Sequence, residues 1–179
     1  MNEKIVLRKY DVEKDLLFFH RVHSDITSMK FYGMHAFTSL EESRKLMNDY
    51  LQSEQSGKSI HRVICDEQRN EYMGEIGLYN IHPLHHRADA YCLLMPEHRQ
   101  KGLSLPASAL MYHEAFEHLG INRVQALVDS RNEMAIKSLF GIGFSHEGKL
   151  RHYECVDGEY IDMEMFSLLK SDFNEVFGK

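Results

Sequence analysis

The sequence predicts a single α/β domain built on one mixed sheet. Short apolar runs typical of strands recur between amphipathic stretches with helical spacing, and turn residues separate them. The order is a strand, two helices, three strands, a helix, a strand, a helix and two strands, which is typical of a mixed α/β sheet. The chain has 179 residues and no linker or repeat, so we expect one domain with a sizeable core over residues 1–179.

The first half of the chain begins with a predicted strand at residues 5–8, where apolar and polar residues alternate. Asp11 is a typical N-cap for the helix that follows. Ser39 and Glu42 form a capping box, which predicts a second helix through Leu51. The next three strands are predicted at residues 61–65, 72–78 and 88–94.

The second half begins with a helix at Ser104, whose apolar stripe ends before Gly120. Residues 123–128 predict another strand, and residues 132–140 predict a short helix. Residues 144–169 alternate on both sides of an Asp-Gly turn, which predicts a closing hairpin. The sequence patterns together predict about seven strands and four helices.

The composition of the chain indicates which kinds of molecule it is expected to bind. The net charge of −6 argues against a nucleic-acid partner and favours a cationic substrate, although acidic charge also serves solubility. No apolar run approaches the roughly 18 residues needed to cross a bilayer, so we expect no membrane association. Cys65, Cys92 and Cys155 are scattered without a Cys-x-x-Cys pair, which is typical of reduced thiols in the cytoplasm.

The chain contains 12 histidines, which raises the question of a metal site. His20 and His23 share one helix, and a second group lies in the loop around His85. No cysteine or carboxylate completes either group at ligand spacing, so we expect surface histidines and no metal.

The most informative segment is Arg99-Gln100-Lys101-Gly102-Leu103-Ser104, which joins a predicted strand to the helix at Ser104. The first amides of a helix have no partner within the helix, and the helix dipole adds positive charge there, so such a turn binds phosphate. Gly102 removes a Cβ that would keep a phosphate away from the backbone. The spacing differs from that of the nucleoside-triphosphate loop and of the dinucleotide fingerprint.

With its elements in this order, the chain resembles the GNAT superfamily of N-acetyltransferases over nearly its whole length. The family motif for the acyl-CoA pyrophosphate is Gln/Arg-x-x-Gly-x-Gly/Ala, which the segment from Arg99 matches except at Ser104. Arg87-Ala88-Asp89 and residues 157–162 are similar to the branch that holds ribosomal-protein (Rim-type) and spermidine N-acetyltransferases.

The resemblance implies acetyl-CoA as co-substrate. In this family the strand at Leu93 and Leu94 splays away from the strand at residues 124–128, and its backbone pairs with pantetheine. The remaining cofactor contacts implied are the amides of Gln100, Lys101, Gly102, Leu103 and Ser104 at the pyrophosphate, Arg99 or Lys101 near phosphate, and the Asn132 side chain.

Acetyl transfer to an amine needs a proton acceptor and a donor to the thioester oxygen. Glu75, in a strand beside the central one, is the candidate base, and its alternative is a solvated strand residue. The family implies a backbone N–H close to Leu94 as the oxygen donor. Many relatives protonate the leaving thiolate with a tyrosine where this chain has Leu139. Ser138, Tyr91, Tyr153 and Cys155 are other candidates, and the thiolate can also leave unprotonated.

The acceptor site is expected between the first two helices, the aromatic connection at residues 31–35 and the closing hairpin. Candidate contacts are Tyr32, Asp89, Tyr153 and Asp162, where either aspartate can alternatively pair with a nearby arginine. We therefore expect an acetyl-CoA-dependent N-acetyltransferase that acts on a protein N-terminal amine or a small amine. The alternatives are a spermidine N-acetyltransferase and a non-catalytic acyl-CoA-binding regulator. Edge strands in the hairpin make a homodimer or higher oligomer plausible.

Overall fold

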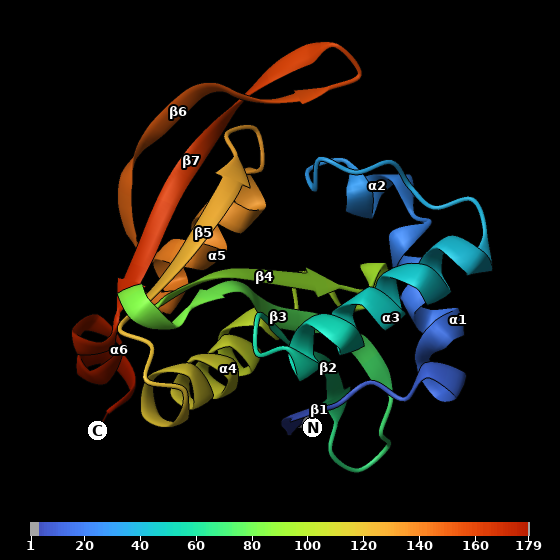
Figure 1. The fold of residues 1–179 in the computed structure, drawn as a ribbon, viewed down its shortest axis with the longest axis horizontal. Helices are drawn as coiled ribbons and strands as arrows, with labels where there is room; N and C mark the ends of the chain where they lie inside the picture. Colours follow the sequence, from blue (N-terminus) through green and yellow to red (C-terminus); the bar gives the residue numbers. More distant parts are fainter. Residues whose placement is uncertain (1–3, 179) are drawn as a thin grey trace.

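Seven strands form one mixed sheet in the order β1-β2-β3-β4-β5-β7-β6 (Figure 1). The structure is a computed structural model and describes residues 4–178. The strands are β1 Ile5–Arg8, β2 Ile60–Asp66, β3 Tyr72–His82, β4 Arg87–Leu94, β5 Arg123–Asp129, β6 Ser145–Val156 and β7 Glu159–Leu169. The helices are α1 Val12–His23, α2 Ile26–Met29, α3 Leu40–Gln55, α4 Ser104–His118, α5 Glu133–Ile142 and α6 Lys170–Phe177, with short 3-10 helices η1 Pro83–His85 and η2 Pro96–His98. The predicted mixed α/β sheet is confirmed.

The predicted number of helices is wrong, because two helices have no clear sequence pattern. α2 has only four residues, too few to show a helical period, and it depends on Asp25, whose side chain accepts from the amides of Thr27 and Ser28. α6 follows β7 directly, so no turn residue marks its start in the sequence. Its Phe173 packs on Phe116 of α4, with ring centroids 5.2 Å apart.

Alternation along the strands separates two cores on opposite faces of the sheet. On one face, residues such as Ile64 and Ile76 pack with α4, α5 and α6. On the other face, Val63 and Leu93 pack with α1, α2 and α3. Each face is therefore covered by helices, and the sheet lies between them.

The sheet opens in its middle. β4 and β5 are parallel and pair only from Arg87 with Arg123 to Asp89 with Gln125. β5 then follows β7 along its whole length, while β4 stays with β3 (Figure 1). The second half of β4 consequently has an open edge toward β5. This splay is the one that the family resemblance implies.

Within residues 4–178, no helix combines the length and the apolar character that crossing a bilayer requires.

Candidate active site

The open edge of β4 presents backbone groups of alternate residues. The N–H of Met95 donates to the carbonyl of Met73 on β3 at 2.9 Å. In an antiparallel pair, alternate residues bond to the neighbouring strand and those between them face away. The register pairs Leu93 with Glu75 and Leu94 with Gly74. The backbone of Leu93 is therefore directed to β3, and that of Leu94 toward β5.

Cys92 shares the orientation of Leu94, since it lies two residues before it. The carbonyls of both residues have side-chain donors. The Tyr32 hydroxyl donates to the Cys92 carbonyl at 2.6 Å, and Arg99 Nε donates to the Leu94 carbonyl at 3.1 Å. The N–H groups of Cys92 and Leu94 are the donors that this edge presents toward the gap. The sequence motifs do not point to Cys92 as a backbone donor, although the alternation of residues along a strand predicts that it shares the orientation of Leu94.

The turn between β4 and α4 has the open backbone that a diphosphate needs. Gln100 and Gly102 have φ of 60° and 74°, so both residues adopt left-handed backbone conformations in this turn. A Cβ on Gly102 would have no atom of the described residues within 4 Å, so the backbone of Gly102 is open on that side. Ser104 is the first helical residue, and its hydroxyl lies 3.0 Å from that of Ser138 on α5. The residues present thus fit a phosphate group.

The two cations of this turn have different surroundings. Lys101 is exposed and makes no ion pair with the residues the structure describes. Arg99 is directed instead toward α2, where its guanidinium bonds to Ser28 Oγ and lies 3.5 Å from Asp25 Oδ2.

α5 contributes its N-terminus and one apolar side chain. Asn132 caps the helix, since its Oδ1 accepts from the amide of Ala135 at 3.1 Å. Leu139 is buried in the core beside α4 and brings no polar group. A proton donor equivalent to the family tyrosine is therefore not supplied at residue 139.

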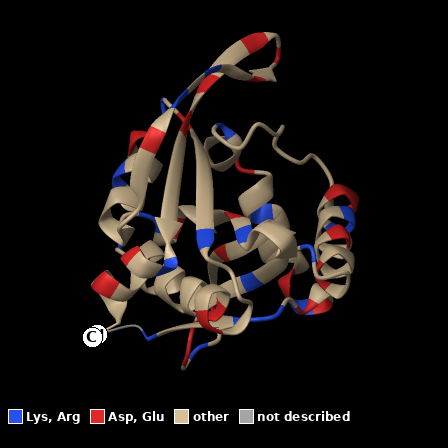
Figure 2. Ribbon diagram, turned by 60° about the vertical axis from the view of Figure 1, so that its left-hand side comes forward, with Lys and Arg blue, Asp and Glu red and all other residues tan. Residues whose placement is uncertain are grey.

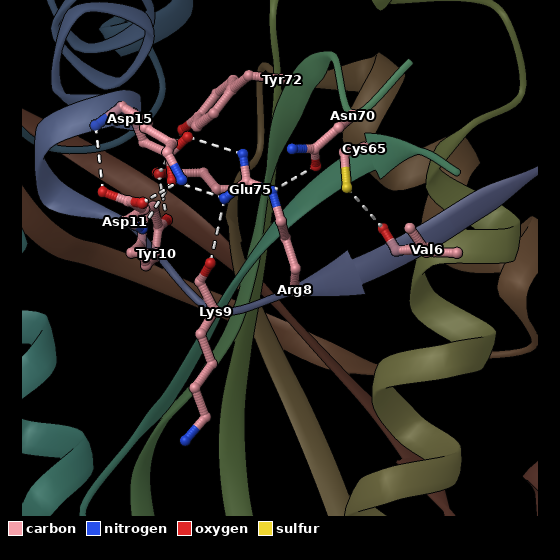
Figure 3. Close-up of polar contacts among 11 residues, drawn as sticks. Val6, Arg8, Lys9, Tyr10, Asp11, Asp15, Cys65, Asn70, Tyr72 and Glu75 are labelled. Carbon is pink, nitrogen blue, oxygen red and sulfur yellow. Dashed lines mark hydrogen bonds and ion pairs between the residues drawn. The ribbon is translucent and has the colours of Figure 1, made fainter. Parts of the chain in front are cut away.

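Glu75 is completely buried beneath α1, so the alternative of a solvated strand residue is wrong. Its Oε2 accepts from the hydroxyls of Tyr10 at 2.6 Å and Tyr72 at 3.3 Å (Figure 3). Its Oε1 lies 2.8 Å from His23 Nε2. Burial, reinforced by the Glu75 carboxylate, raises the pKa of both tyrosines well above 10, so their phenols stay protonated and donate.

His23 was expected to be a surface histidine, and this expectation is wrong, because its ring is buried against Glu75. It is buried between the rings of Phe19 and Phe37, with centroids 4.2 and 5.3 Å away. Its Nδ1 has no partner among the residues that the structure describes, and its Nε2–H is assigned as the donor to Glu75. Its position four residues after Phe19 on the apolar stripe of α1 was the available signal for burial.

A groove of about 260 Å³ lies between the connection after α2 and the ends of β5, β6 and β7. Four carboxylates and two cationic side chains contribute to its lining: Asp129, Glu154, Asp157 and Glu159 with Lys30 and Arg131. Figure 2 shows Asp and Glu in red at the tip of the β6–β7 hairpin. Arg131 is already paired with Asp129 at 2.7 Å and with Glu159 at 3.1 Å. The groove therefore has excess negative charge.

The remaining acceptor candidates are dispersed. Asp89 accepts from Asn80 and Gln125 at 2.7 and 2.6 Å, and so links β3, β4 and β5 below the point where the strands separate. Asp162 accepts from the amide of His152 at 2.9 Å. Tyr153 is exposed on the hairpin. Of the four candidates, Tyr32 alone contacts the open edge of β4.

Comparison with known proteins decides the family. Residues 4–145 match the family model of the acetyltransferase (GNAT) domain. The N-acetyltransferase p20 of Bacillus licheniformis, itself uncharacterised, is 30% identical over 171 residues, which cover 96% of each chain. This protein belongs to the GNAT acetyltransferase family. As a GNAT N-acetyltransferase it uses an acyl-CoA co-substrate and an amine acceptor.

Two further GNAT relatives are spermidine N-acetyltransferases. The enzyme of Escherichia coli K12 is 27% identical over 147 residues, covering 82% of this chain and 76% of that one. The structure of the Vibrio cholerae enzyme with CoA and spermine has a TM-score of 0.85 at 23% identity and covers 96% of this chain and 99% of that one, which shows the shared fold. Among residues 4–178, no group of three or more His, Cys, Asp or Glu side chains is arranged for a metal ion.

Proposed function

We propose that this GNAT enzyme transfers the acetyl group of acetyl-CoA directly to a cationic amine in a ternary complex. The observation that carries the proposal is the juxtaposition of two features. One is the gap beside β4, with its phosphate-type turn. The other is the acidic groove at the adjoining ends of β5, β6 and β7.

On the donor side, the open edge of β4 suits the pantetheine arm as an added strand. The N–H of Leu94 is the proposed donor to the thioester oxygen, with the N–H of Cys92 as a second donor on the same edge. The amides of residues 100–104 are proposed to hold the diphosphate, with Lys101 and Asn132 near it. The acyl-CoA would supply the activated thioester, and this chain would orient it.

In the proposed step the amine nitrogen attacks the thioester carbon, the carbon–sulfur bond breaks, and CoA leaves as a thiolate. The amine loses one proton, and Glu75 is its proposed final acceptor. Glu75 is fully buried, so the proton would reach it through Tyr10, Tyr72 or His23. The core position of Leu139 supports departure of the thiolate without a donor from α5.

Direct transfer is preferred to an acetyl-cysteine intermediate for a chemical reason. Burial, aided by the charge of Glu75, raises the pKa of the Cys92 thiol to about 12. The thiolate is the nucleophilic form, so Cys92 has very little of it at neutral pH. We expect intersecting initial-rate plots, and a ping-pong pattern would contradict the proposal.

The acceptor is proposed to be a polyamine-like cation, since the groove has four carboxylates for two cationic side chains. The names of the two spermidine enzymes support the same class. A Rim-type reaction on a protein N-terminal amine is the second candidate, which the aromatic connection at residues 31–35 could accommodate.

A panel of amines tests the proposal through release of CoA thiol from acetyl-CoA. Spermidine and spermine should react faster than a peptide with a free N-terminus. Glu154→Gln should lower kcat/KM for spermidine by about tenfold, the usual worth of one charge-assisted contact, while Glu41→Gln on the exposed face of α3 serves as the matched control. Preference for the peptide would favour the Rim-type candidate. Acetyl-CoA binding without turnover of any amine would favour the regulator.

A further inference from the structure

The side chain of Arg99 connects two parts of the site that are far apart in sequence. Its Nε donates to the carbonyl of Leu94 at the end of β4. Its Nη2 bonds to Ser28 Oγ and lies 3.5 Å from Asp25 Oδ2. Only 31% of the side chain is exposed. A guanidinium with partners on both sides has few donors left for a phosphate.

The partners on α2 are themselves organised. Asp25 caps α2 and accepts from the amide and the hydroxyl of Ser28 at 3.0 and 2.5 Å. Burial opposes ionisation, yet hydrogen bonds from Ser28 and Thr27 lower the pKa of Asp25 to about 2. The carboxylate is therefore charged at neutral pH and complements Arg99.

The segment that follows, residues 25–37, forms the acceptor side of the site. Tyr32 bonds to Cys92 on the open edge of β4. Lys30, Phe31 and Gly33 line the acidic groove. Together, Arg99 and Tyr32 attach this segment to both carbonyls of β4 that face the gap.

We propose that Arg99 is a positioning residue that fastens the acceptor-side segment, residues 25–37, to the edge of β4, and that Lys101 is the cation near the diphosphate. This inference rests on the proposed function. Loss of Arg99 would release the wall of the groove while the amides of residues 100–104 remain available to acyl-CoA. The effect would fall on the acceptor, with little change in the affinity for acetyl-CoA.

The experiment compares Arg99→Gln, Arg99→Lys, Ser28→Ala and Lys101→Gln in the full chain. Calorimetry measures the Kd of acetyl-CoA, and hydrogen exchange measures protection of the amides of residues 26–37. Arg99→Gln should lower that protection by about tenfold, as loss of one charge-assisted contact predicts, and leave the Kd nearly unchanged. Arg99→Lys should give a similar loss of protection, because the single ammonium nitrogen of lysine does not reproduce the two separate donor atoms, Nε and Nη2, that reach Leu94 and Ser28. Ser28→Ala should reproduce part of the loss.

Lys101→Gln is expected to show the opposite pattern, with a weaker Kd and unchanged exchange. In turnover assays, Arg99→Gln should raise KM for the amine more than KM for acetyl-CoA. A weaker Kd for Arg99→Gln with normal exchange would overturn the proposal, as would normal exchange in both Arg99→Lys and Ser28→Ala. The binding and exchange measurements need no amine. If no amine is acetylated, the proposed function is contradicted, while the exchange and Kd results still test the role of Arg99.

Discussion

The hydroxyl of Tyr32 donates to the carbonyl of Cys92 at 2.6 Å, across 60 residues of sequence. This bond occupies a backbone group that a neighbouring strand would satisfy in a continuous sheet. An aromatic side chain from the acceptor side thus reaches the edge that is proposed to receive pantetheine.

Tyr32→Phe removes this bond and leaves the ring in place. We expect the free energy of unfolding to fall by about 1 kcal/mol, because a part-buried carbonyl loses its donor. Urea denaturation measures the change. Tyr153→Phe is the matched control, since that ring is 57% exposed and should change stability by less than about 0.5 kcal/mol. Equal losses in the two variants would contradict the structural role of the Tyr32 bond.

Glu75→Gln preserves the shape of the side chain and removes its proton affinity. If Glu75 is the final proton acceptor, kcat/KM at neutral pH should fall by about 10²–10⁴ and the pH–rate profile should change. The measurement is kcat/KM for spermidine across the pH range. Tyr72→Phe, which leaves the carboxylate and its bond from Tyr10, should be affected less. An unchanged pH–rate profile in Glu75→Gln would refute the assignment.

His61 should make the protein sensitive to mild acid. Burial lowers the pKa of His61 from 6.5 to about 4, so the unfolded chain binds a proton more readily than the folded one. The contribution of the uncharged His61 to the free energy of unfolding is present above about pH 6.5 and is lost as the pH falls toward 4. At pH 5 the loss should be about 2 kcal/mol. His61→Phe keeps the stacking on Tyr50 and should remove this part of the pH dependence, whereas His113→Gln on the exposed side of α4 should not.

Gly77 and Gly141 should respond oppositely to alanine. A Cβ on Gly77 would collide with Tyr91 and lie 2.8 Å from both His61 Nδ1 and the carbonyl of Ile60, so Gly77→Ala should cost about 1–3 kcal/mol. Gly141 lies within α5 with nothing near its Cβ, so Gly141→Ala should stabilise by about 0.5–1 kcal/mol. Thermal unfolding of both variants measures the difference. A stable Gly77→Ala variant would show that Tyr91 can move aside.

The order of elements and the glycine-containing turn before α4 are predictable from the sequence, because both depend on local patterns. The alternating runs of β4 and β5, the stripe of α4 and the glycine at 102 are each visible within a few residues. The same local information predicted Glu75 as an unusual carboxylate in a strand. It could not show that Tyr10 and His23 converge on Glu75, because Tyr10 lies in the connection between β1 and α1 and His23 lies at the end of α1, both more than 50 residues from Glu75.

The directions of the polar groups depend on the tertiary fold and are not visible in the sequence. Arg99 lies in a motif that predicts a phosphate contact, yet its guanidinium is bonded to α2, a helix too short to be recognised in the sequence. The backbone of Leu94 is directed to the gap and that of Leu93 to β3, because strand pairing sets this alternation. Side-chain direction and long-range pairing follow from packing between distant segments. For this reason the sequence predicts the local turn before α4, and only the fold brings the segments of the proposed acceptor side together.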